Sequence, residues 1–235
     1  MDWTKPSLAH YRYIRSLPYK HLPSGLDYWI RQEGVTLYVA FAETFMPEPD
    51  GDWNDNLNFF PSKYEIYKGL KAHSGYAKQY LSIRDTLMDY LYGGTVKQIF
   101  VSGYSLGGAM TVLAVQDIGY HIDRDKLNIK VYGIAYCPPR AFCAFSKLVK
   151  CVVKDRLVLV KVRNDPFGYL PLPAMLIPFT FRFKPFGLRF APPWKWLSFW
   201  SNYGKVIRIG KPWRFLPFQH RPEQVERALL EKYHG

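Results

Sequence analysis

The 235-residue sequence predicts an α/β fold, in which a mixed, mostly parallel β-sheet is flanked by helices. Strand-like and helix-like segments alternate from Lys97 to Val162, and such alternation is typical of parallel strands joined by right-handed crossovers. Within this stretch, a serine lies between glycines where a buried strand-like run gives way to an apolar helix-like run. With 48% hydrophobic residues, the chain is long enough for one well-filled core, so we expect a single domain over residues 1–235.

Periodicity and turn residues predict the individual elements. The expected strands are Asp27–Gln32, Val35–Phe41, Ile99–Ser102, Ile129–Tyr136 and Arg156–Val162. The expected helices are Tyr76–Tyr92, Leu106–Ile118, Ala141–Val152 and Pro222–Tyr233. The first two strands form a hairpin at Glu33-Gly34, and Pro222 suits the first turn of its helix. We expect Phe45–Asn58 to be a loop and Phe167–Pro217 to be irregular with short extended pieces.

The serine between glycines is the most specific motif in the chain. Gly103-Tyr104-Ser105-Leu106-Gly107 matches the G-x-S-x-G pattern of the nucleophile elbow, which is typical of α/β-hydrolases. The glycines let the backbone turn sharply where a β-carbon would clash. The turn would expose the Ser105 hydroxyl beside backbone N–H groups at a helix N-terminus. The alternative is a glycine-rich turn with an incidental serine, and the strand before it and the helix after it favour the elbow.

A nucleophilic serine needs a histidine as general base and an acid that orients the histidine, in the chain order serine, acid, histidine. His220 lies in a loop just before the last helix, whereas His121 is at the far end of the elbow helix and His234 is next to the chain end. Asp165 follows an apolar strand, where catalytic groups gather in an α/β sheet. The predicted triad is Ser105, Asp165 and His220. His73, which precedes the serine, is the rival base, and we interpret it as structural.

Segments in the order of the chain resemble motifs of the class 3 lipases, the family of fungal-type triacylglycerol lipases and plant-type phospholipases A1. They are VAFAET, DWNDNLNF, AHSGYAKQY, GYSLGGAM, YGIAYCPPRAF, VRNDPFGYLP and FQHRPEQV, and they run from about Val39 to His220. The resemblance implies an α/β-hydrolase fold with Ser105 as nucleophile, Asp165 as orienting acid and His220 as base.

The resemblance also implies an oxyanion hole made by Thr44, through its backbone N–H and hydroxyl, and by the N–H of Leu106. Four positions depart from the family motifs: Ala42-Glu43 replaces Arg-Gly, Tyr104 replaces a common histidine, and Cys137 replaces a glycine. A carboxylate that points into an oxyanion hole opposes the negative charge that develops there. We therefore expect Glu43 to face away from the hole, or the activity to be weak.

These residues predict a serine-dependent carboxylic ester hydrolase that acts on lipid acyl esters, of the triacylglycerol lipase or phospholipase A1 type. Acyl transfer to a serine requires neither a metal nor an organic cofactor, so we expect none. The alternative is a catalytically weak or inactive hydrolase-fold protein that binds anionic membrane surfaces.

The net charge of +13, from 32 basic and 19 acidic residues, indicates an attraction to anionic surfaces. Much of the excess lies in a basic aromatic segment, Phe179–Arg214, which contains no Asp or Glu. Its candidate membrane contacts are Trp194, Trp196 and Trp200, because aromatic rings and basic residues suit the headgroup boundary. The alternative is that these aromatics pack into the core and the charges are solvated. Since no zinc-finger spacing or RNA-binding signature accompanies the charge, we expect no nucleic-acid partner.

The number and spacing of the cysteines and the composition of the first residues predict the cellular compartment of the protein. Cys137, Cys143 and Cys151 are odd in number and form no C-x-x-C pair, which argues against a disulfide framework and a structural zinc site. We therefore expect buried free thiols, no bound metal and a cytoplasmic location. The first residues lack the apolar core of a signal peptide, and no run of about 18 apolar residues predicts a membrane-spanning helix. Membrane contact would then be peripheral.

Overall fold

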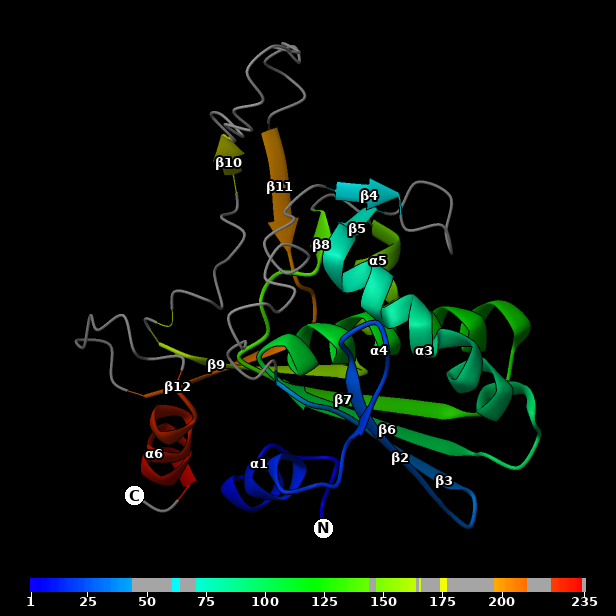
Figure 1. Ribbon diagram of the computed structural model, residues 1–235, viewed down its shortest axis with the longest axis horizontal. Helices are drawn as coiled ribbons and strands as arrows, with labels where there is room; N and C mark the ends of the chain where they lie inside the picture. Colours follow the sequence, from blue (N-terminus) through cyan, green and yellow to red (C-terminus); the bar gives the residue numbers. More distant parts are fainter. Residues whose placement is uncertain are drawn as a thin grey trace.

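The computed structural model describes residues 1–43, 61–63, 71–143, 147–163, 165, 174–176, 197–210 and 221–233. A seven-stranded sheet in the order β1-β2-β3-β6-β7-β9-β12 forms the centre (Figure 1). Its strands are β1 (Lys20–His21), β2 (Asp27–Glu33), β3 (Thr36–Phe41), β6 (Gln98–Tyr104), β7 (Lys130–Tyr136), β9 (Leu157–Val162) and β12 (Lys205–Ile209). The first three strands pair antiparallel, and every pair from β3 to β12 is parallel. The predicted mixed, mostly parallel sheet is confirmed.

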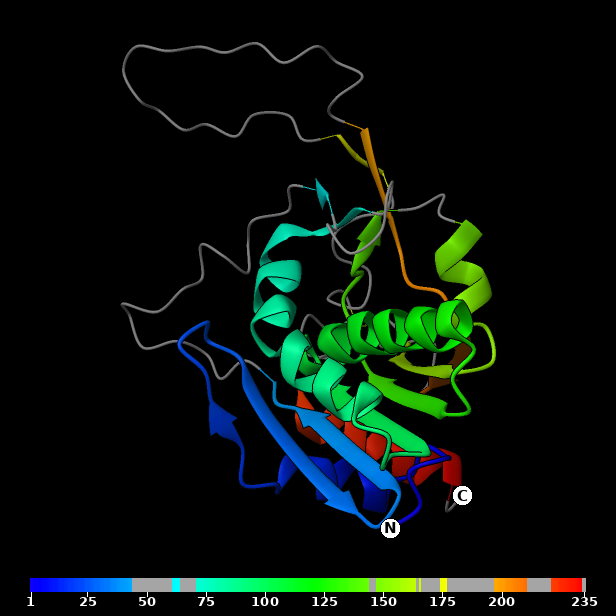
Figure 2. The ribbon, with the colours of Figure 1, turned by 90° about the vertical axis from the view of Figure 1, so that its right-hand side faces the viewer.

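Helices cover both faces of this sheet (Figures 1 and 2). On one face lie α3 (Ser74–Tyr92) and α4 (Leu106–Asp125), and on the other lie α1 (Leu8–Arg15) and α6 (Pro222–Tyr233). A further helix, α5 (Lys147–Val153), packs against α4. Because α4 lies between the sheet, α3 and α5, it is buried on nearly all sides, which explains its continuously apolar sequence.

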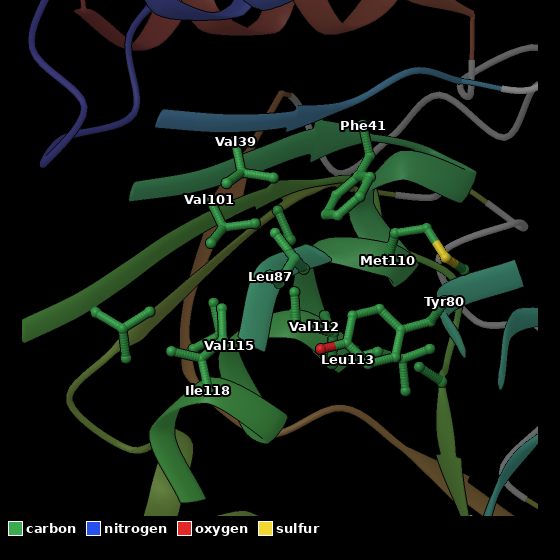
Figure 3. Packing of buried hydrophobic residues seen from close by; sticks show 14 of the residues in the cluster. Val39, Phe41, Tyr80, Leu87, Val101, Met110, Val112, Leu113, Val115 and Ile118 are labelled. Atoms are coloured by element: carbon green, nitrogen blue, oxygen red, sulfur yellow. The ribbon is translucent and has the colours of Figure 1, made fainter. Parts of the chain in front are cut away.

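Successive side chains of each strand point to opposite faces of the sheet, so they belong to two hydrophobic cores, one on each face. Val39 and Phe41 of β3 and Val101 of β6 point toward residues of α3 and α4 (Figure 3). The residues between them, such as Ala40 and Phe100, face the core that α1 and α6 cover. The carboxyl ends of the parallel strands are therefore held between two packed layers of helices.

A smaller, five-stranded antiparallel sheet has the order β10-β11-β8-β5-β4 (Figure 1). Its strands are β4 (Pro61–Lys63), β5 (Lys71–His73), β8 (Phe142–Cys143), β10 (Ala174–Leu176) and β11 (Leu197–Ser201). The sequence does not predict this sheet. The helix predicted over Ala141–Val152 is wrong at its start, because Phe142 is fully buried and pairs with Ala72 across strands, and α5 begins only at Lys147.

The other predicted elements between residues 27 and 162 are confirmed with small changes at their ends. The elbow helix runs past Ile118 to Asp125, and α6 has the predicted bounds. Within the stretch predicted as irregular with short extended pieces, β12 is one such piece, and it extends the main sheet by pairing in parallel with β9. The loop predicted over Phe45–Asn58 lies outside the described residues.

Helix α1 is an element that the sequence analysis does not predict. Ser7 caps it, since the Ser7 Oγ accepts the N–H of His10 at 3.0 Å. Its apolar residues follow helical spacing and are buried against the sheet: Leu8, Tyr11 and Ile14. On its outer side, Arg12 donates two hydrogen bonds to Glu226 of α6 at 3.0 and 2.8 Å. This contact joins the first helix of the chain to the last.

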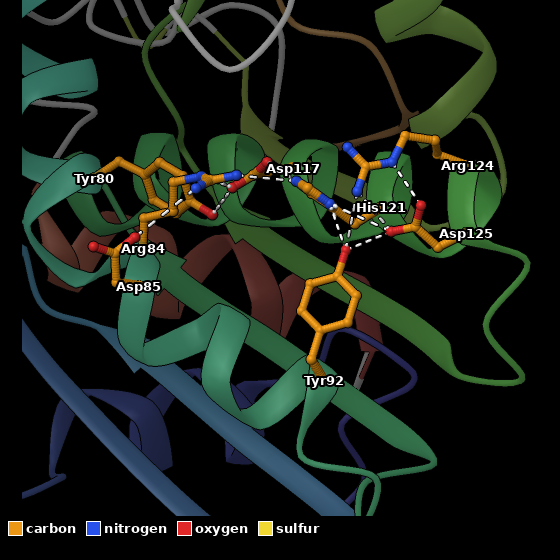
Figure 4. A network of polar contacts seen from close by, with 8 residues as sticks. All are labelled: Tyr80, Arg84, Asp85, Tyr92, Asp117, His121, Arg124 and Asp125. Carbon is orange, nitrogen blue, oxygen red and sulfur yellow. Dashed lines mark hydrogen bonds and ion pairs between the residues drawn. The ribbon is translucent and has the colours of Figure 1, made fainter.

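A network of polar contacts holds α3 against α4 (Figure 4). The buried Asp117 carboxylate accepts hydrogen bonds from Tyr80 at 2.9 Å and from Arg84 at 2.8 Å. His121 completes it with ring nitrogens 3.0 Å from Arg84 and 2.7 Å from the Tyr92 hydroxyl. At 1.5 Å per residue, His121 lies more than about 20 Å along α4 from the elbow, so its role is structural.

The cysteines are only partly as predicted. Cys137 is a buried free thiol, whereas Cys151 is free but exposed, so the expectation of burial is wrong for Cys151. Cys151 lies on the outer side of α5, where helical spacing turns it away from the buried neighbours Val152 and Val153. The Cys143 side chain lies outside the described part of the chain. Of the helices in the described residues, none combines the length and apolar character that crossing a membrane requires.

Two fully buried histidines lie in the scaffold. His10 has its Nδ1 3.0 Å from the Tyr136 hydroxyl, and burial lowers its pKa to about 4. His73 caps α3, where its Nδ1 accepts the N–H of Tyr76 and its ring stacks on the Tyr76 ring, and burial lowers its pKa to about 4 as well. These contacts are those of a structural residue, as the sequence analysis interprets His73.

We predict that the protein loses stability between pH 7 and pH 5 because of His10 and His73. An unfolded histidine has a pKa of about 6.5, so in this range the unfolded chain binds protons that the folded chain does not. Stability is therefore fully present above pH 6.5 and is lost as the pH falls toward 4, by about 2 kcal/mol per histidine at pH 5. Urea unfolding at both pH values should show a smaller loss for His10→Gln, and an equal loss would contradict the assignment.

Candidate active site

Ser105 lies in a sharp turn between the end of β6 and the start of α4, as predicted. Its backbone has φ 54° and ψ −118°, a conformation that non-glycine residues rarely adopt and that costs of order 1–3 kcal/mol. Two backbone hydrogen bonds hold it, from the Ser105 N–H to the Tyr136 carbonyl at 2.9 Å and from the Ala109 N–H to the Ser105 carbonyl at 3.1 Å. Hydrogen bonds to β7 of the sheet and to α4 therefore hold Ser105 in its strained conformation.

The glycines on both sides of Ser105 are required by a close backbone approach. A β-carbon on Gly107 would lie 2.1 Å from the carbonyl oxygen of Phe41 in β3, and one on Gly103 would lie 2.3 Å from the carbonyl oxygen of Gly107. Contacts this short are not tolerated, so any side chain would push the first turn of α4 away from the sheet. The G-x-S-x-G spacing is thus a consequence of how α4 packs on the end of β3.

Leu106 is the first residue of α4, and its N–H belongs to the first helical turn, where N–H groups have no partner within the helix. The positive end of the helix dipole is at the same place, which favours a developing negative charge. Phe41 is opposite Gly103 in the parallel β3–β6 pair. Glu43 and Ser105, each two residues further along the chain, therefore both lie just past the carboxyl ends of these neighbouring strands. Thr44, the other predicted oxyanion donor, lies outside the described residues.

Asp165 is buried, with 1% of its surface exposed, just beyond the end of β9. The strands β6, β7 and β9 are parallel neighbours in which Tyr104, Tyr136 and Val160 stand side by side. Ser105 and Asp165 therefore follow strand ends at the same edge of the sheet. His220, the third predicted triad residue, lies outside the described residues, and α6 begins at Pro222.

The Asp165 carboxylate acts electrostatically on its neighbours. Cys137, at the end of β7, is fully buried with φ 47°, and burial together with the Asp165 charge raises the pKa of its thiol well above the usual range. Burial, with a contribution from the same carboxylate, raises the pKa of Tyr104. Burial and nearby cations lower the pKa of Lys161 to about 8, and Asp165 opposes this shift. The acid thus lies within electrostatic range of the residue that precedes Ser105.

Glu43, the unexpected carboxylate next to the predicted oxyanion hole, forms an ion pair with α1. The Arg15 Nε and Nη2 both donate to its Oε1, at 3.0 and 2.7 Å, and the side chains are 31% and 18% exposed for Arg15 and Glu43. The carboxylate therefore points toward the helix, as expected if it is to spare the oxyanion hole. Arg15 belongs to a helix that the sequence analysis misses, and only helical spacing from Leu8 to Ile14 signals it.

A hollow of about 440 Å³ lies between α1 and the carboxyl ends of β3 and β6. Its lining includes the Arg15–Glu43 ion pair, the hydrogen-bonded side chains of His21 and Asp27, and the rings of Tyr19 and Tyr104. The hollow therefore gives small solutes access to the guanidinium of Arg15.

The remaining predictions from the sequence concern metal binding and membrane contact. Among the described residues, no group of three or more His, Cys, Asp or Glu side chains is placed to hold a metal ion. Trp194 and Trp196 lie outside the described part of the chain, and for Trp200 only its backbone position in β11 is described. The membrane contacts therefore stay a prediction.

Comparison with known proteins identifies the family. Residues 48–174, more than half of the chain, match the family described as Lipase (class 3). The chain belongs to the class 3 lipase family. This class 3 lipase-family chain is 26% identical over 155 residues to the secreted mono- and diacylglycerol lipase MDL3 of Malassezia globosa, a match that covers 58% of this chain and 50% of that protein. That relative is described as secreted, which gives no support to the cytoplasmic location expected above.

Solved lipase structures share the fold of this class 3 lipase-family chain. Lipase II from Rhizopus niveus superimposes with a TM-score of 0.50 at 18% identity, over 66% of this chain and 59% of that one. The mono- and diacylglycerol lipase from Aspergillus oryzae gives a TM-score of 0.49 at 20% identity, over 66% and 56%. The chain thus has the α/β-hydrolase fold, and it spans about half the length of the curated relative that it matches.

We predict that Gly107→Ala destabilises this class 3 lipase-family protein by more than about 3 kcal/mol. Helix propensity alone would stabilise the variant by about 1 kcal/mol, so the sign of the effect reports the contact with the Phe41 carbonyl. Gly94→Ala is the control, because its β-carbon would meet no atom within 4 Å and the cost comes from a positive φ alone. Urea unfolding measures both; a neutral Gly107→Ala would contradict the close approach.

Proposed function

We propose that the protein is a serine-dependent carboxylic ester hydrolase that acts on lipid acyl esters. The observation that carries the proposal is the strained elbow, with Ser105 at φ 54° directly before the first turn of α4. Glycine would adopt this backbone conformation at lower cost, so a serine at this position indicates a functional role for its side chain. Membership of the class 3 lipases, and a relative named as a mono- and diacylglycerol lipase, favour glycerol esters as the substrate class.

In the proposed reaction, His220 accepts the Ser105 proton as the Ser105 oxygen attacks the ester carbonyl carbon. The Leu106 N–H, with Thr44, stabilises the oxyanion of the tetrahedral intermediate. The protonated His220 then gives its proton to the leaving alcohol as the C–O bond breaks, which leaves an acyl-enzyme. Water, deprotonated by the same histidine, attacks the acyl carbon and releases the fatty acid and the free serine.

Asp165 suits the role of the orienting acid because it is buried beside the ends of the parallel strands. A carboxylate in a low-dielectric site interacts strongly with an imidazolium nearby, so it fixes the ring orientation and stabilises the cation that forms on proton transfer. We assign this role to Asp165 on its position relative to the elbow.

We further propose that residues 1–235 form one domain and that the basic aromatic segment Phe179–Arg214 contacts anionic membranes. The support is chemical: the segment combines Arg, Lys, Phe and Trp without any Asp or Glu, in a chain of net charge +13. Each basic residue near an anionic surface contributes about 1 kcal/mol, and tryptophan is favoured at the headgroup boundary.

We predict that Ser105→Ala, Asp165→Asn and His220→Ala each lower the hydrolysis of a lipid acyl ester at least about a thousandfold. The losses should not multiply in combined variants, because the three side chains act as one unit. A fluorophosphonate probe should label the wild type and fail to label Ser105→Ala.

His73→Ala is the control for the base, since His73 caps α3 and its ring is stacked and buried. It is expected to lose stability and to keep the chemistry in the fraction that folds. Folded wild-type protein that does not react with the probe would rule out the hydrolase and leave the anionic-membrane-binding alternative.

We predict that the protein sediments with anionic vesicles better than with neutral ones, and that salt weakens this binding. Changing Trp194, Trp196 and Trp200 together to Ala should reduce it. Trp29, whose ring stacks on that of Trp3 in the folded core, provides the matched Trp→Ala control. Equal binding to neutral and anionic vesicles, or none at all, would contradict membrane contact and leave a hydrolase that works on dispersed esters.

A further inference from the structure

We propose that Arg15 of α1 is a positioning residue for the catalytic centre, because its guanidinium joins the carboxylate next to the oxyanion hole to the aromatic ring that precedes the nucleophile. The inference rests on the proposed function and adds a residue that the triad and the oxyanion hole do not contain. It follows from contacts on two different strand ends.

The first contact is with the end of β3. Glu43 directly precedes Thr44, the proposed oxyanion donor, and its Oε1 accepts hydrogen bonds from the Nε and Nη2 of Arg15 at 3.0 and 2.7 Å. Burial disfavours the charged Arg15, yet the hydrogen bond and the charge of Glu43 keep its pKa above the usual value. The two charges therefore neutralise each other in a partly buried place, where an unpaired carboxylate would oppose the oxyanion.

The second contact is with the end of β6. The Arg15 guanidinium carbon lies 5.9 Å from the ring centre of Tyr104 and 5.7 Å from that of Tyr11, within the range of cation–π attraction. The Tyr104 ring is buried and meets the Tyr11 ring edge to face at 5.4 Å. Because Tyr104 is joined directly to Ser105, a shift of its ring moves the strained backbone that presents the nucleophile.

One side chain thus fixes two strand ends relative to each other. The strands β3 and β6 are paired through Phe41 and Gly103, and beyond that pair Arg15 is the link between Glu43 on one side and Tyr104 on the other. Oxyanion stabilisation depends on donors that are held about 3 Å from the developing charge, with their positions fixed to within about 0.5 Å. Loss of the link should therefore lower kcat more than it raises KM.

The chain offers a matched control at the opposite edge of the sheet. Arg156 donates to both oxygens of Asp123 at 2.7 and 2.6 Å, and its side chain is 26% exposed, close to the 31% of Arg15. Arg156 directly precedes β9 and so lies at the amino end of the parallel strands. Arg156→Ala should cost comparable stability without an effect on the catalytic step.

The hollow beside Arg15 makes chemical rescue possible. Its volume of about 440 Å³ and its lining by both Arg15 and Glu43 leave room for a free guanidinium ion to occupy the place of the missing side chain. Guanidinium at millimolar concentration is far below the molar range in which it unfolds proteins. Rescue therefore reports the charge and hydrogen bonds of Arg15 rather than the packing of α1.

The experiment measures kcat and KM for ester hydrolysis, and the rate of fluorophosphonate labelling, in purified variants. We expect Arg15→Ala to lower kcat and the labelling rate about tenfold to a hundredfold, with KM changed less than about threefold. The double variant Arg15→Ala with Glu43→Gln also removes the unpaired carboxylate, and its kcat and labelling rate should be about tenfold higher than those of Arg15→Ala. Millimolar guanidinium should partly restore Arg15→Ala, with no effect on the double variant or on Arg156→Ala.

Several results would overturn the proposal: a wild-type kcat in Arg15→Ala, an equal loss in Arg156→Ala, or no recovery in the double variant. If Arg15→Ala does not fold, Arg15→Lys carries the test, since it keeps the charge but not the paired hydrogen bonds; its kcat should lie below that of the wild type and respond to Glu43→Gln. Wild-type protein that does not label would refute the hydrolase itself, whereas equal labelling of wild type and Arg15→Ala would refute only the role of Arg15.

Discussion

The site depends on one steric constraint, the absence of β-carbons where α4 meets the ends of β3 and β6. The Phe41 carbonyl lies where a side-chain carbon of Gly107 would be, and the Gly107 carbonyl lies where that of Gly103 would be. The two glycines allow this close approach, which places the first turn of α4 and its N–H groups at the carboxyl ends of β3 and β6. The packing of α4 on the sheet and the position of Ser105, the proposed nucleophile, thus depend on the same contact.

The sequence predicts the parts of the fold whose signals are local. The strand before Ser105, the helix after it and the apolar strand that ends shortly before Asp165 can be predicted, because periodicity and glycine placement report backbone geometry directly. What it misses depends on partners far along the chain. Strand β8 replaces a predicted helical turn because Phe142 is buried against Ala72, and the sequence does not indicate that the extended piece at β12 pairs with β9. Such pairing overrides local propensity.

The candidate site, like the fold, has a part that the sequence predicts and a part that it does not predict. The residue types of a serine hydrolase can be read from the motifs, and so can the anomaly at Glu43. The ion pair that neutralises Glu43 cannot be predicted from the sequence, because Arg15 lies in α1 and only the fold brings the two side chains together. Ion pairs between distant residues leave no periodic trace in a single sequence. A departure from a family motif is therefore best interpreted together with the side chain that compensates for it.

The contact between α1 and α6 has a consequence for the order in which this molecule is made. Both helices pack on one face of the sheet, and the Arg12–Glu226 pair joins them, although 214 positions of the chain separate these two residues. During synthesis, the emerging chain holds α1 without its partner until α6 leaves the ribosome. The apolar residues on this face of the sheet, which α1 and α6 cover together, therefore stay partly exposed until α6 has been synthesised.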